Sequence, residues 1–175
     1  MHKKSLYILF AVSCVAIGYF FLYSKKPSDG YCAFCDEKVV EFQKFYEDDL
    51  VLALYTHKPV LPGHCLIIPK RHVERFEMLT DEEITQMGRV IKKVNDAVTV
   101  VFETSAYLLL QKNGYEVGQT VPHVHFHYIP RKAGDDSMVT LLFKMVIANA
   151  RKPLPPAETQ KVVEQMKNAM KMGSD

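Results

Sequence analysis

The chain has 175 residues, enough for one domain with its own hydrophobic core, and carries a formal net charge of +2. Its basic and acidic residues are mixed along the sequence, and it contains no Trp. A basic surface interleaved with aromatic side chains is therefore not expected, and nucleic acid is not an expected partner.

The first segment predicts a membrane anchor. Residues 5–24 contain no charged side chain and are flanked on each side by a pair of lysines. A helix of this length spans about 30 Å, the hydrocarbon thickness of a bilayer. Aromatic residues, rather than the small residues of a signal-peptide cleavage site, stand at the far end of the segment. We therefore expect an uncleaved anchor over residues 1–24, followed by a linker over residues 25–30.

The next apolar runs predict strands and a long helix. Leu50 to Tyr55 and Cys65 to Ile68 have strand length, and a turn with Pro and Gly separates them, so an antiparallel pair is expected. Thr80 and Glu83 form a capping box. Apolar residues then recur every three or four positions as far as Val101, which predicts one face of a long helix.

The last elements complete the expected fold class. Leu108 to Gln111 and Pro122 to Pro130 read as two strands parted by the turn-forming Asn113-Gly114, and Pro155 to Met172 is amphipathic. Residues 31–175 are therefore expected to form one α+β domain. It would have a mostly antiparallel sheet, one long helix and one C-terminal helix, next to the N-terminal transmembrane helix.

Three histidines at alternate positions suggest chemistry. On an extended strand His123, His125 and His127 share one face, with Val124 and Phe126 on the other. Imidazole is a good nucleophile toward phosphorus at neutral pH, and neighbouring imidazoles can orient it or protonate a leaving group. Three imidazoles can also bind zinc. The spacing alone leaves open nucleophilic catalysis, a metal site and a chance surface run.

At these residues the chain resembles the histidine triad family, whose signature is His-x-His-x-His followed by apolar residues. The resemblance covers nearly all of residues 31–175. The matching motifs, in chain order, are Cys32-Ala33-Phe34-Cys35, Tyr46-Glu47-Asp48-Asp49, PGHCLIIPKRH from Pro62 to His72, Asn113-Gly114, Gly118-Gln119-Thr120-Val121, and the triad ending in Ile129-Pro130-Arg131.

The resemblance implies an enzyme. It would be a nucleotidyl hydrolase or transferase that cleaves a phosphoramidate, acyl-phosphate or polyphosphate linkage of a nucleotide through a covalent nucleotidyl-histidine intermediate. His125 would attack the phosphorus, His127 would contact the phosphate, and His64 would lie beside the nucleophile. Gln119 and Thr120 would donate hydrogen bonds to phosphate oxygens, where charge builds up in the transition state.

The nucleoside half of the implied site includes Leu54, Thr56 and Asn113. Two positions depart from the family pattern. Thr56 stands where an Asp usually holds the ribose hydroxyls, and a hydroxyl binds them less strongly than a carboxylate. Lys112 stands where an Asn or Gln often precedes the turn. Both departures concern the nucleoside rather than the phosphate chemistry.

Cys32 and Cys35 form a CxxC pair. A linker precedes the pair and Asp36 follows it, which is the context of neither a thioredoxin-like nor a haem-attachment motif. A zinc site needs two more ligands. Zinc-carrying members of the superfamily take them from a His after the second strand and from the first His of the triad, which implies His72 and His123 here. A Zn²⁺ ion with four protein ligands would be structural.

The resemblance also implies a two-fold homodimer, formed through the long helix and a sheet edge. Three functions remain as alternatives: a nucleotidyl hydrolase, a phosphorylase or transferase of the same fold, and a membrane-anchored, zinc-stabilised binding module with vestigial catalysis. Nucleotide substrates and reduced CxxC thiols favour the cytosolic side of a membrane. The expected location is thus that of a single-pass membrane protein whose domain faces the cytosol.

Overall fold

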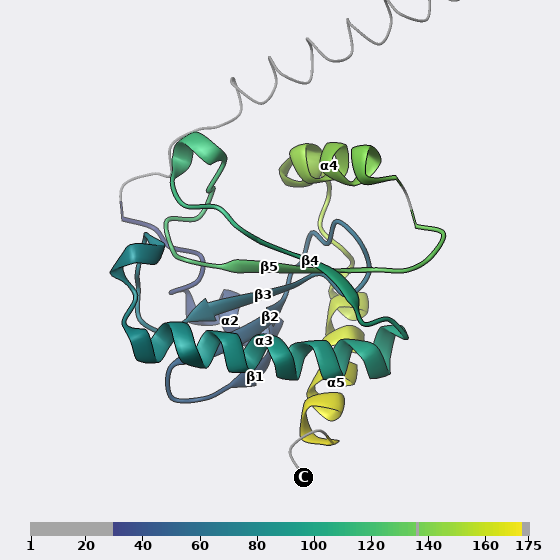
Figure 1. Cartoon of the computed structure of the whole chain (residues 1–175), viewed down its shortest axis with the longest axis horizontal. Helices are drawn as coiled ribbons and strands as arrows, with labels where there is room; N and C mark the ends of the chain where they lie inside the picture. Colours follow the sequence, from purple (N-terminus) through teal and green to yellow (C-terminus); the bar gives the residue numbers. More distant parts are fainter. Residues whose placement is uncertain (1–29, 136, 173–175) are drawn as a thin grey trace, which may run out of the picture.

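The fold is built on a five-stranded sheet with the strand order β1-β2-β3-β5-β4, in which every neighbouring pair is antiparallel (Figure 1). The computed structural model describes residues 30–135 and 137–172. The strands are β1 (Lys44–Glu47), β2 (Val51–Tyr55), β3 (Cys65–Pro69), β4 (Ala106–Gln111) and β5 (Phe126–Arg131). The helices are α2 (Glu37–Gln43), α3 (Asp81–Phe102), α4 (Met138–Ile147) and α5 (Pro156–Met172), with 3₁₀ turns at Phe76–Met78, Tyr115–Val117 and Ala148–Ala150. The predicted α+β class with an antiparallel sheet is confirmed.

The central strands are apolar because both faces of the sheet are covered. Every residue of β2 and β3 is buried, which explains the two continuous apolar runs in the sequence. On one face, α3 and α5 pack against the sheet (Figure 1). On the other face, the segment before α2 contributes Cys32 and Phe34 to a smaller apolar cluster with β2 and β3.

The capping box of the long helix is confirmed. The Thr80 side chain accepts a hydrogen bond from the Glu83 amide, and the Glu83 carboxylate accepts one from the Thr80 amide. The same carboxylate is almost completely buried and accepts two hydrogen bonds from Arg71, at 3.0 and 2.7 Å. The start of α3 is thereby joined to the chain that leaves β3.

The histidine segment differs from the expected strand at its beginning. β5 starts at Phe126 rather than at Pro122. Before it, the Val124 amide donates to the Val73 carbonyl, at 2.6 Å, beyond the end of β3. His123 and His125 therefore lie in an extended segment that leads into β5, and His127 lies in the strand itself.

Three elements were not predicted from the sequence. α2 and β1 are too short to carry a periodic signal. α4 begins at Ser137, whose side chain accepts a hydrogen bond from the Thr140 amide. Its apolar residues face both ways, since Leu141 is buried whereas Leu142 and Phe143 are exposed.

The membrane location expected from the sequence is corrected by the structure. Among residues 30–135 and 137–172, no helix combines the length and the apolar character needed to cross a bilayer. α3 has 22 residues, but it carries charged side chains on its exposed face. The anchor and linker expected over residues 1–24 and 25–30 lie outside the described residues, apart from Gly30.

Candidate active site and metal site

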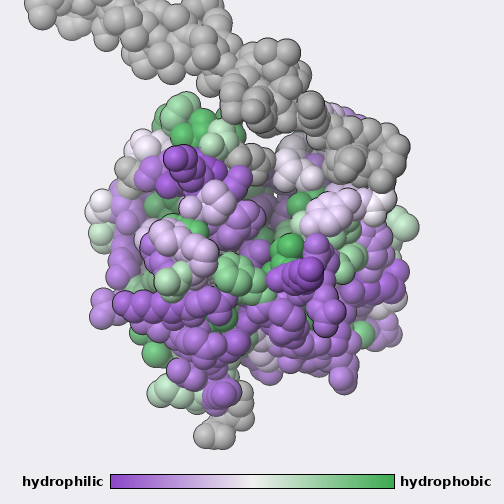
Figure 2. Space-filling view, turned by 180° about the vertical axis from the view of Figure 1, so that it is seen from behind, coloured by the Kyte–Doolittle hydropathy of each residue, from purple (hydrophilic) through white to green (hydrophobic). Residues whose placement is uncertain are grey.

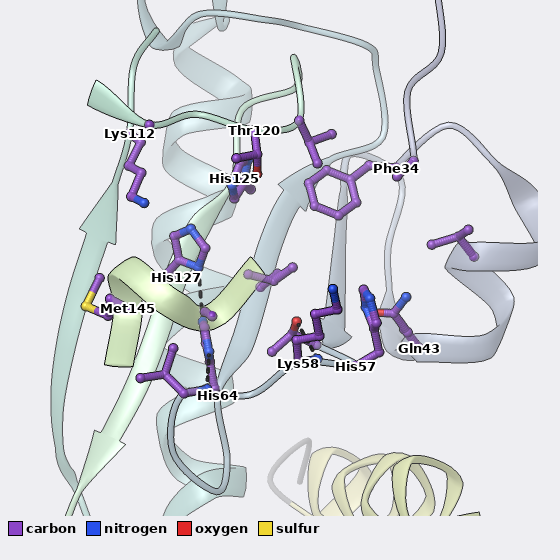
Figure 3. Close-up of a pocket in the computed structure, with 18 residues that line it drawn as sticks. Phe34, Gln43, His57, Lys58, His64, Lys112, Thr120, His125, His127 and Met145 are labelled. Carbon is purple, nitrogen blue, oxygen red and sulfur yellow. Dashed lines mark hydrogen bonds between the residues drawn. The ribbon is translucent and has the colours of Figure 1, made fainter. Parts of the chain in front are cut away.

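A cavity of about 160 Å³ opens on the face of the sheet that α3 leaves free. His64, His125 and His127 line it, together with side chains from α2, the loop after β2 and α4 (Figure 3). Figure 2 shows the molecule from the side opposite Figure 1, where hydrophobic side chains come to the surface among polar ones. Of the described residues that line the cavity, Lys58 and Lys112 are cationic and none is a carboxylate. The cavity is therefore suited to an anion.

The hydrogen bond of His125 fixes which ring nitrogen carries its proton. His125 Nδ1 lies 2.7 Å from the His123 carbonyl oxygen, which can only accept, so Nδ1 is the donor. Nε2 therefore keeps its lone pair. Burial lowers the pKa of His125 to about 4, so the ring is neutral at neutral pH. The arrangement supplies a neutral imidazole with an available nitrogen nucleophile in the wall of an anion-binding cavity.

A second chain of hydrogen bonds fixes the other two rings. The Val60 amide donates to His64 Nδ1 at 3.2 Å, so His64 carries its proton on Nε2. His64 Nε2 lies 3.0 Å from His127 Nδ1 and donates to it (Figure 3). His127 therefore carries its own proton on Nε2. Burial lowers the pKa of His64 to about 3 and lowers that of His127 as well, so both rings stay neutral.

The rings of His125 and His127 are adjacent. Their centroids are 4.8 Å apart and their planes meet at 72°. Phe34 packs with its ring 5.2 Å from that of His125, in an edge-on arrangement. The two imidazoles, one with a free lone pair and one with an N–H donor, are thus held side by side by packing as well as by hydrogen bonds.

The predicted zinc ligands also meet in space. The ligand atoms of Cys32, Cys35, His72 and His123 all lie within 4.8 Å of one another. His123 Nδ1 is 3.4 Å from Cys32 Sγ and 3.7 Å from Cys35 Sγ, and His72 Nδ1 is 3.3 Å from Cys35 Sγ. Zinc bonds of about 2.3 Å to sulfur and 2.0 Å to nitrogen at tetrahedral angles separate the ligand atoms by about 3.5 Å. These residues fit a tetrahedral Cys₂His₂ site.

The surroundings of His123 support the same fit. Its Nε2 lies 2.9 Å from the Pro69 carbonyl oxygen and donates to it, so Nδ1 turns an unprotonated nitrogen toward the two thiols. Histidine ligands commonly donate their second ring nitrogen to a carbonyl in this way. His123 is fully buried and does not line the cavity. The triad is thus divided between two sites, with His123 at the cysteines and the other two histidines at the cavity.

Only some of the expected substrate-binding residues line the cavity. Thr56 and Thr120 line the cavity, whereas Gln119, Asn113 and Leu54 do not. The Gln119 amide accepts from the Gly114 amide at 2.6 Å and donates to the Glu74 carbonyl at 2.9 Å, which holds the loop before the triad. Asn113 bonds to the chain at Phe76 and Glu77, and Leu54 is fully buried. The structure does not bring these three side chains to the cavity.

Several lining residues were not singled out from the sequence. Gln43 and Val39 come from α2, and Met145 comes from α4. Neither helix was predicted, so no pattern in the sequence pointed to these positions. Phe34 lies between the two cysteines of the CxxC motif, and this position is the feature of the sequence that could have identified it as a lining residue. Lys58 lies in the turn between the first two expected strands, where a single lysine is not distinctive.

Comparisons with known proteins show what this chain is similar to. The family model of the HIT domain matches residues 37–134. A bis(5'-nucleosyl)-tetraphosphatase (asymmetrical) of Schizosaccharomyces pombe is 42% identical over 107 residues, which cover 61% of this chain and 59% of the relative. A bifunctional bis(5'-adenosyl)-triphosphatase/adenylylsulfatase of Arabidopsis thaliana is 38% identical over 103 residues, covering 59% of this chain and 57% of the relative. The chain thus spans under two thirds of the length of these two relatives.

A solved structure shows a similar fold. The crystal structure of the Caenorhabditis elegans NitFhit protein matches with a TM-score of 0.61 and 30% sequence identity. The match covers 73% of this chain and 27% of that one. The fold of this chain therefore has a known structural counterpart over 73% of its length.

Proposed function

This chain belongs to the HIT domain family, and on that basis we propose that it is a nucleotide hydrolase acting on dinucleoside polyphosphates, with His125 as the nucleophile. The observation that carries the proposal is the hydrogen bond from His125 Nδ1 to the His123 carbonyl, because it leaves Nε2 unprotonated in an anion-binding cavity. Two relatives named as a tetraphosphatase and a triphosphatase support the substrate class.

The first step transfers the nucleotidyl group to the enzyme. His125 Nε2 forms a bond to the α-phosphorus, and the bond from that phosphorus to the bridging oxygen breaks. The bridging oxygen keeps the electron pair and leaves as the terminal oxygen of a nucleoside polyphosphate, which needs no proton. Positive charge that appears on the imidazole is stabilised by the His123 carbonyl at Nδ1.

The second step releases the nucleotide. A water oxygen attacks the phosphorus, the bond to His125 Nε2 breaks, and the electron pair returns to that nitrogen. The water gives up a proton to solvent, and a nucleoside monophosphate leaves. In both steps the Nε2–H of His127, whose orientation the His64 chain fixes, donates to a non-bridging phosphate oxygen as charge builds up there.

The Cys32, Cys35, His72 and His123 cluster fits a structural zinc ion. When bound, zinc would hold the thiolates and the two imidazole nitrogens in one closed tetrahedral shell. The protein's own part is positional. The chain at His123 is fixed against Pro69, and the carbonyl of His123 is the acceptor that orients the nucleophile two residues later. A rigid His123 therefore supports a rigid His125.

A trapping experiment tests the nucleophile. Full-length protein is mixed with radiolabelled diadenosine tetraphosphate and denatured during turnover. We expect the label on the peptide that contains His125. This label should be removed by acid, because a phosphorus–nitrogen bond is acid-labile. His125→Asn should lose both the label and at least about a thousand-fold in turnover, as expected when a nucleophile is removed.

Two controls make the result decisive. The His125→Asn protein must keep the melting temperature and metal content of the wild type, so that lost activity is not lost folding. The products of wild-type turnover with and without added phosphate distinguish a hydrolase from a phosphorylase of the same fold. Unchanged turnover by His125→Asn would refute the proposed nucleophile.

A further inference from the structure

Lys112 follows directly after β4 and projects into the cavity (Figure 3). Its side chain is partly buried, and burial lowers the pKa of its ammonium group. Among the residues that the structure describes, no carboxylate lies within ion-pair distance of the Lys112 ammonium, and the cavity lining supplies none. A partly desolvated cation that lacks a counterion in the protein is suited to bind an anion from outside.

The charge of Lys112 acts on the reacting groups. Burial is the main cause of the lowered pKa values of His64, His125 and His127, and the positive charge of Lys112 lowers each of them further. Lys112 and the three imidazoles also line the same cavity, so one phosphate-containing ligand can contact all of them.

The strand order places Lys112 at a defined end of the cavity. Thr56 and His57 follow β2, and Lys112 follows β4, with β3 and β5 between these strands. His127 belongs to β5 and lies between the two ends. Figure 3 likewise shows Lys112 on one side of the imidazoles, with Gln43 and His57 on the other. The two ends can therefore hold different parts of one substrate.

We propose that Lys112 is a specificity-determining residue that binds the phosphates of the leaving group, so that the site selects substrates with a polyphosphate chain beyond the reacting phosphorus. This inference rests on the proposed function, with the transferred nucleoside at the Thr56 end. The neutral rings of His64 and His127 carry no net charge for that chain. Lys112 supplies the missing charge at the end where the leaving group departs.

From the sequence, the replacement of an Asn or Gln by Lys112 was expected to affect nucleoside binding. The proposal assigns Lys112 to phosphate binding instead. An amide at this position would offer a neutral hydrogen bond to any leaving group. An ammonium group instead binds a leaving group more tightly when that group carries more negative charge, because charge-assisted hydrogen bonds are stronger than neutral ones. Lys112 concerns the phosphate chain rather than the nucleoside.

The test compares two substrates that share the transferred group. Diadenosine tetraphosphate has a polyphosphate leaving group, whereas the p-nitrophenyl ester of AMP has a leaving group that needs no proton and carries no phosphate. For Lys112→Gln we expect kcat/KM to fall about 10- to 100-fold on the tetraphosphate, the range for losing a charge-assisted contact. On the nitrophenyl ester we expect kcat/KM to change by less than about three-fold, since its leaving group has no phosphate for Lys112 to contact. We expect inorganic tripolyphosphate to inhibit the wild type competitively and to bind Lys112→Gln correspondingly less tightly.

Two further variants separate a charge effect from a structural one. Lys112→Arg keeps the charge and should recover most of the lost kcat/KM on the tetraphosphate. Lys92→Gln removes a charge from the exposed side of α3 and should leave kcat/KM unchanged on both substrates. All variants should keep the wild-type melting temperature within a few degrees.

The outcomes distinguish this inference from the proposed function. Equal losses of Lys112→Gln on both substrates would assign Lys112 to the shared phosphoryl group and overturn the selectivity, while leaving the hydrolase intact. No loss on either substrate would also overturn it. A wild-type protein that cleaves neither substrate would instead refute the proposed function itself.

Discussion

His64 is a buried histidine whose two ring nitrogens both have partners, with Val60 as donor and His127 as acceptor. That arrangement requires a neutral ring, because a protonated His64 could accept nothing from the Val60 amide. Burial is the main reason why its pKa falls to about 3. Protonation of this ring in the unfolded chain, and not in the folded one, links stability to pH.

The sign of this linkage gives the first prediction. The folded-state pKa lies below the unfolded value of about 6.5, so the stabilisation from His64 is present above that pH and is lost as pH falls. Between pH 7 and pH 5 the loss from one such group is about 2 kcal/mol. We expect His64→Gln to be less stable than the wild type at pH 7, and this difference to shrink by about that amount at pH 5.

Urea unfolding at the two pH values measures this change. Other groups that titrate in the same range are present in both proteins, so their contributions largely cancel in the difference. An equal loss of stability in wild type and His64→Gln would show that His64 is protonated in the folded state.

At the same scale, the sequence predicted which histidines lie together better than it predicted the polar contacts around them. Alternation along an extended segment was enough to predict that His125 and His127 share a face, and both line the cavity. Gln119 was expected to contact phosphate, but the structure shows it bonded to the chain at Gly114 and Glu74. The partner of an amide depends on which loops meet it in space, and a local pattern does not contain that information.

Among the elements, α3 depends most clearly on its first turn. Thr80 and Glu83 satisfy each other's amides, and Glu83 also binds Arg71 beside the end of β3. We predict that Thr80→Ala lowers the free energy of unfolding by about 1 kcal/mol, the usual cost of losing an N-cap side chain. Thr85→Ala is a matched control, because Thr85 is exposed within the same helix and makes no cap.

Chemical unfolding of both variants checks this prediction. Thr85→Ala should be neutral or slightly stabilising, since Ala has the higher helix propensity. A Thr80→Ala protein as stable as Thr85→Ala would mean that Arg71 alone holds Glu83 and that the cap contributes nothing measurable.

The elements that the sequence predicted share a long or regular signal. β2, β3 and α3 were expected nearly at their observed bounds, because two apolar runs and a capped amphipathic pattern specify them locally. α4 was missed because its apolar residues do not follow one face. α2 was missed because seven residues give too few turns for periodicity, although Asp36 caps it by accepting from the Lys38 amide.

The metal cluster joins the segment before α2 to the ends of two neighbouring strands of the sheet. Cys32 and Cys35 precede α2, His72 follows β3, and His123 precedes β5. We predict that the purified protein contains stoichiometric zinc, and that Cys35→Ser or strong chelation removes it. The melting temperature should then fall by about 10 °C, which corresponds to the loss of a few kcal/mol in a chain of this size.

Cys65→Ser provides the comparison for this experiment. Cys65 is fully buried in β3 and is not part of the cluster, so the substitution should destabilise the core without changing the metal content. Elemental analysis of both proteins, together with their melting curves, separates the two effects. Stoichiometric metal in Cys35→Ser would eliminate the proposed ligand set.

For the whole molecule, α3 and α5 leave the β4 edge of the sheet open. α3 packs over β2 and β3, and α5 packs against α3 and β1, while β4 lies at the opposite edge (Figure 1). On β4, Tyr107 and Leu109 are 42% and 38% exposed. The Tyr107 ring stacks on Tyr128, with the centroids 4.3 Å apart, which places it on the same face as α3. An open strand edge next to exposed apolar side chains is suited to pairing with another chain.

This surface makes the dimer expected from the sequence testable. A two-fold axis beside β4 would pair the two edge strands and bury both copies of Leu109 in one interface. We predict that the wild-type protein has the mass of a dimer in light scattering. Leu109→Lys should shift it to the monomer, because two like charges would face each other across the axis in place of apolar contact.

Met172→Lys is the matched control, because it makes the same kind of change at a residue that is 73% exposed at the end of α5, away from β4. It should leave the dimer intact. If both variants remain dimeric, the interface lies elsewhere than at β4. If the wild type is a monomer over the micromolar range, the predicted dimer is wrong.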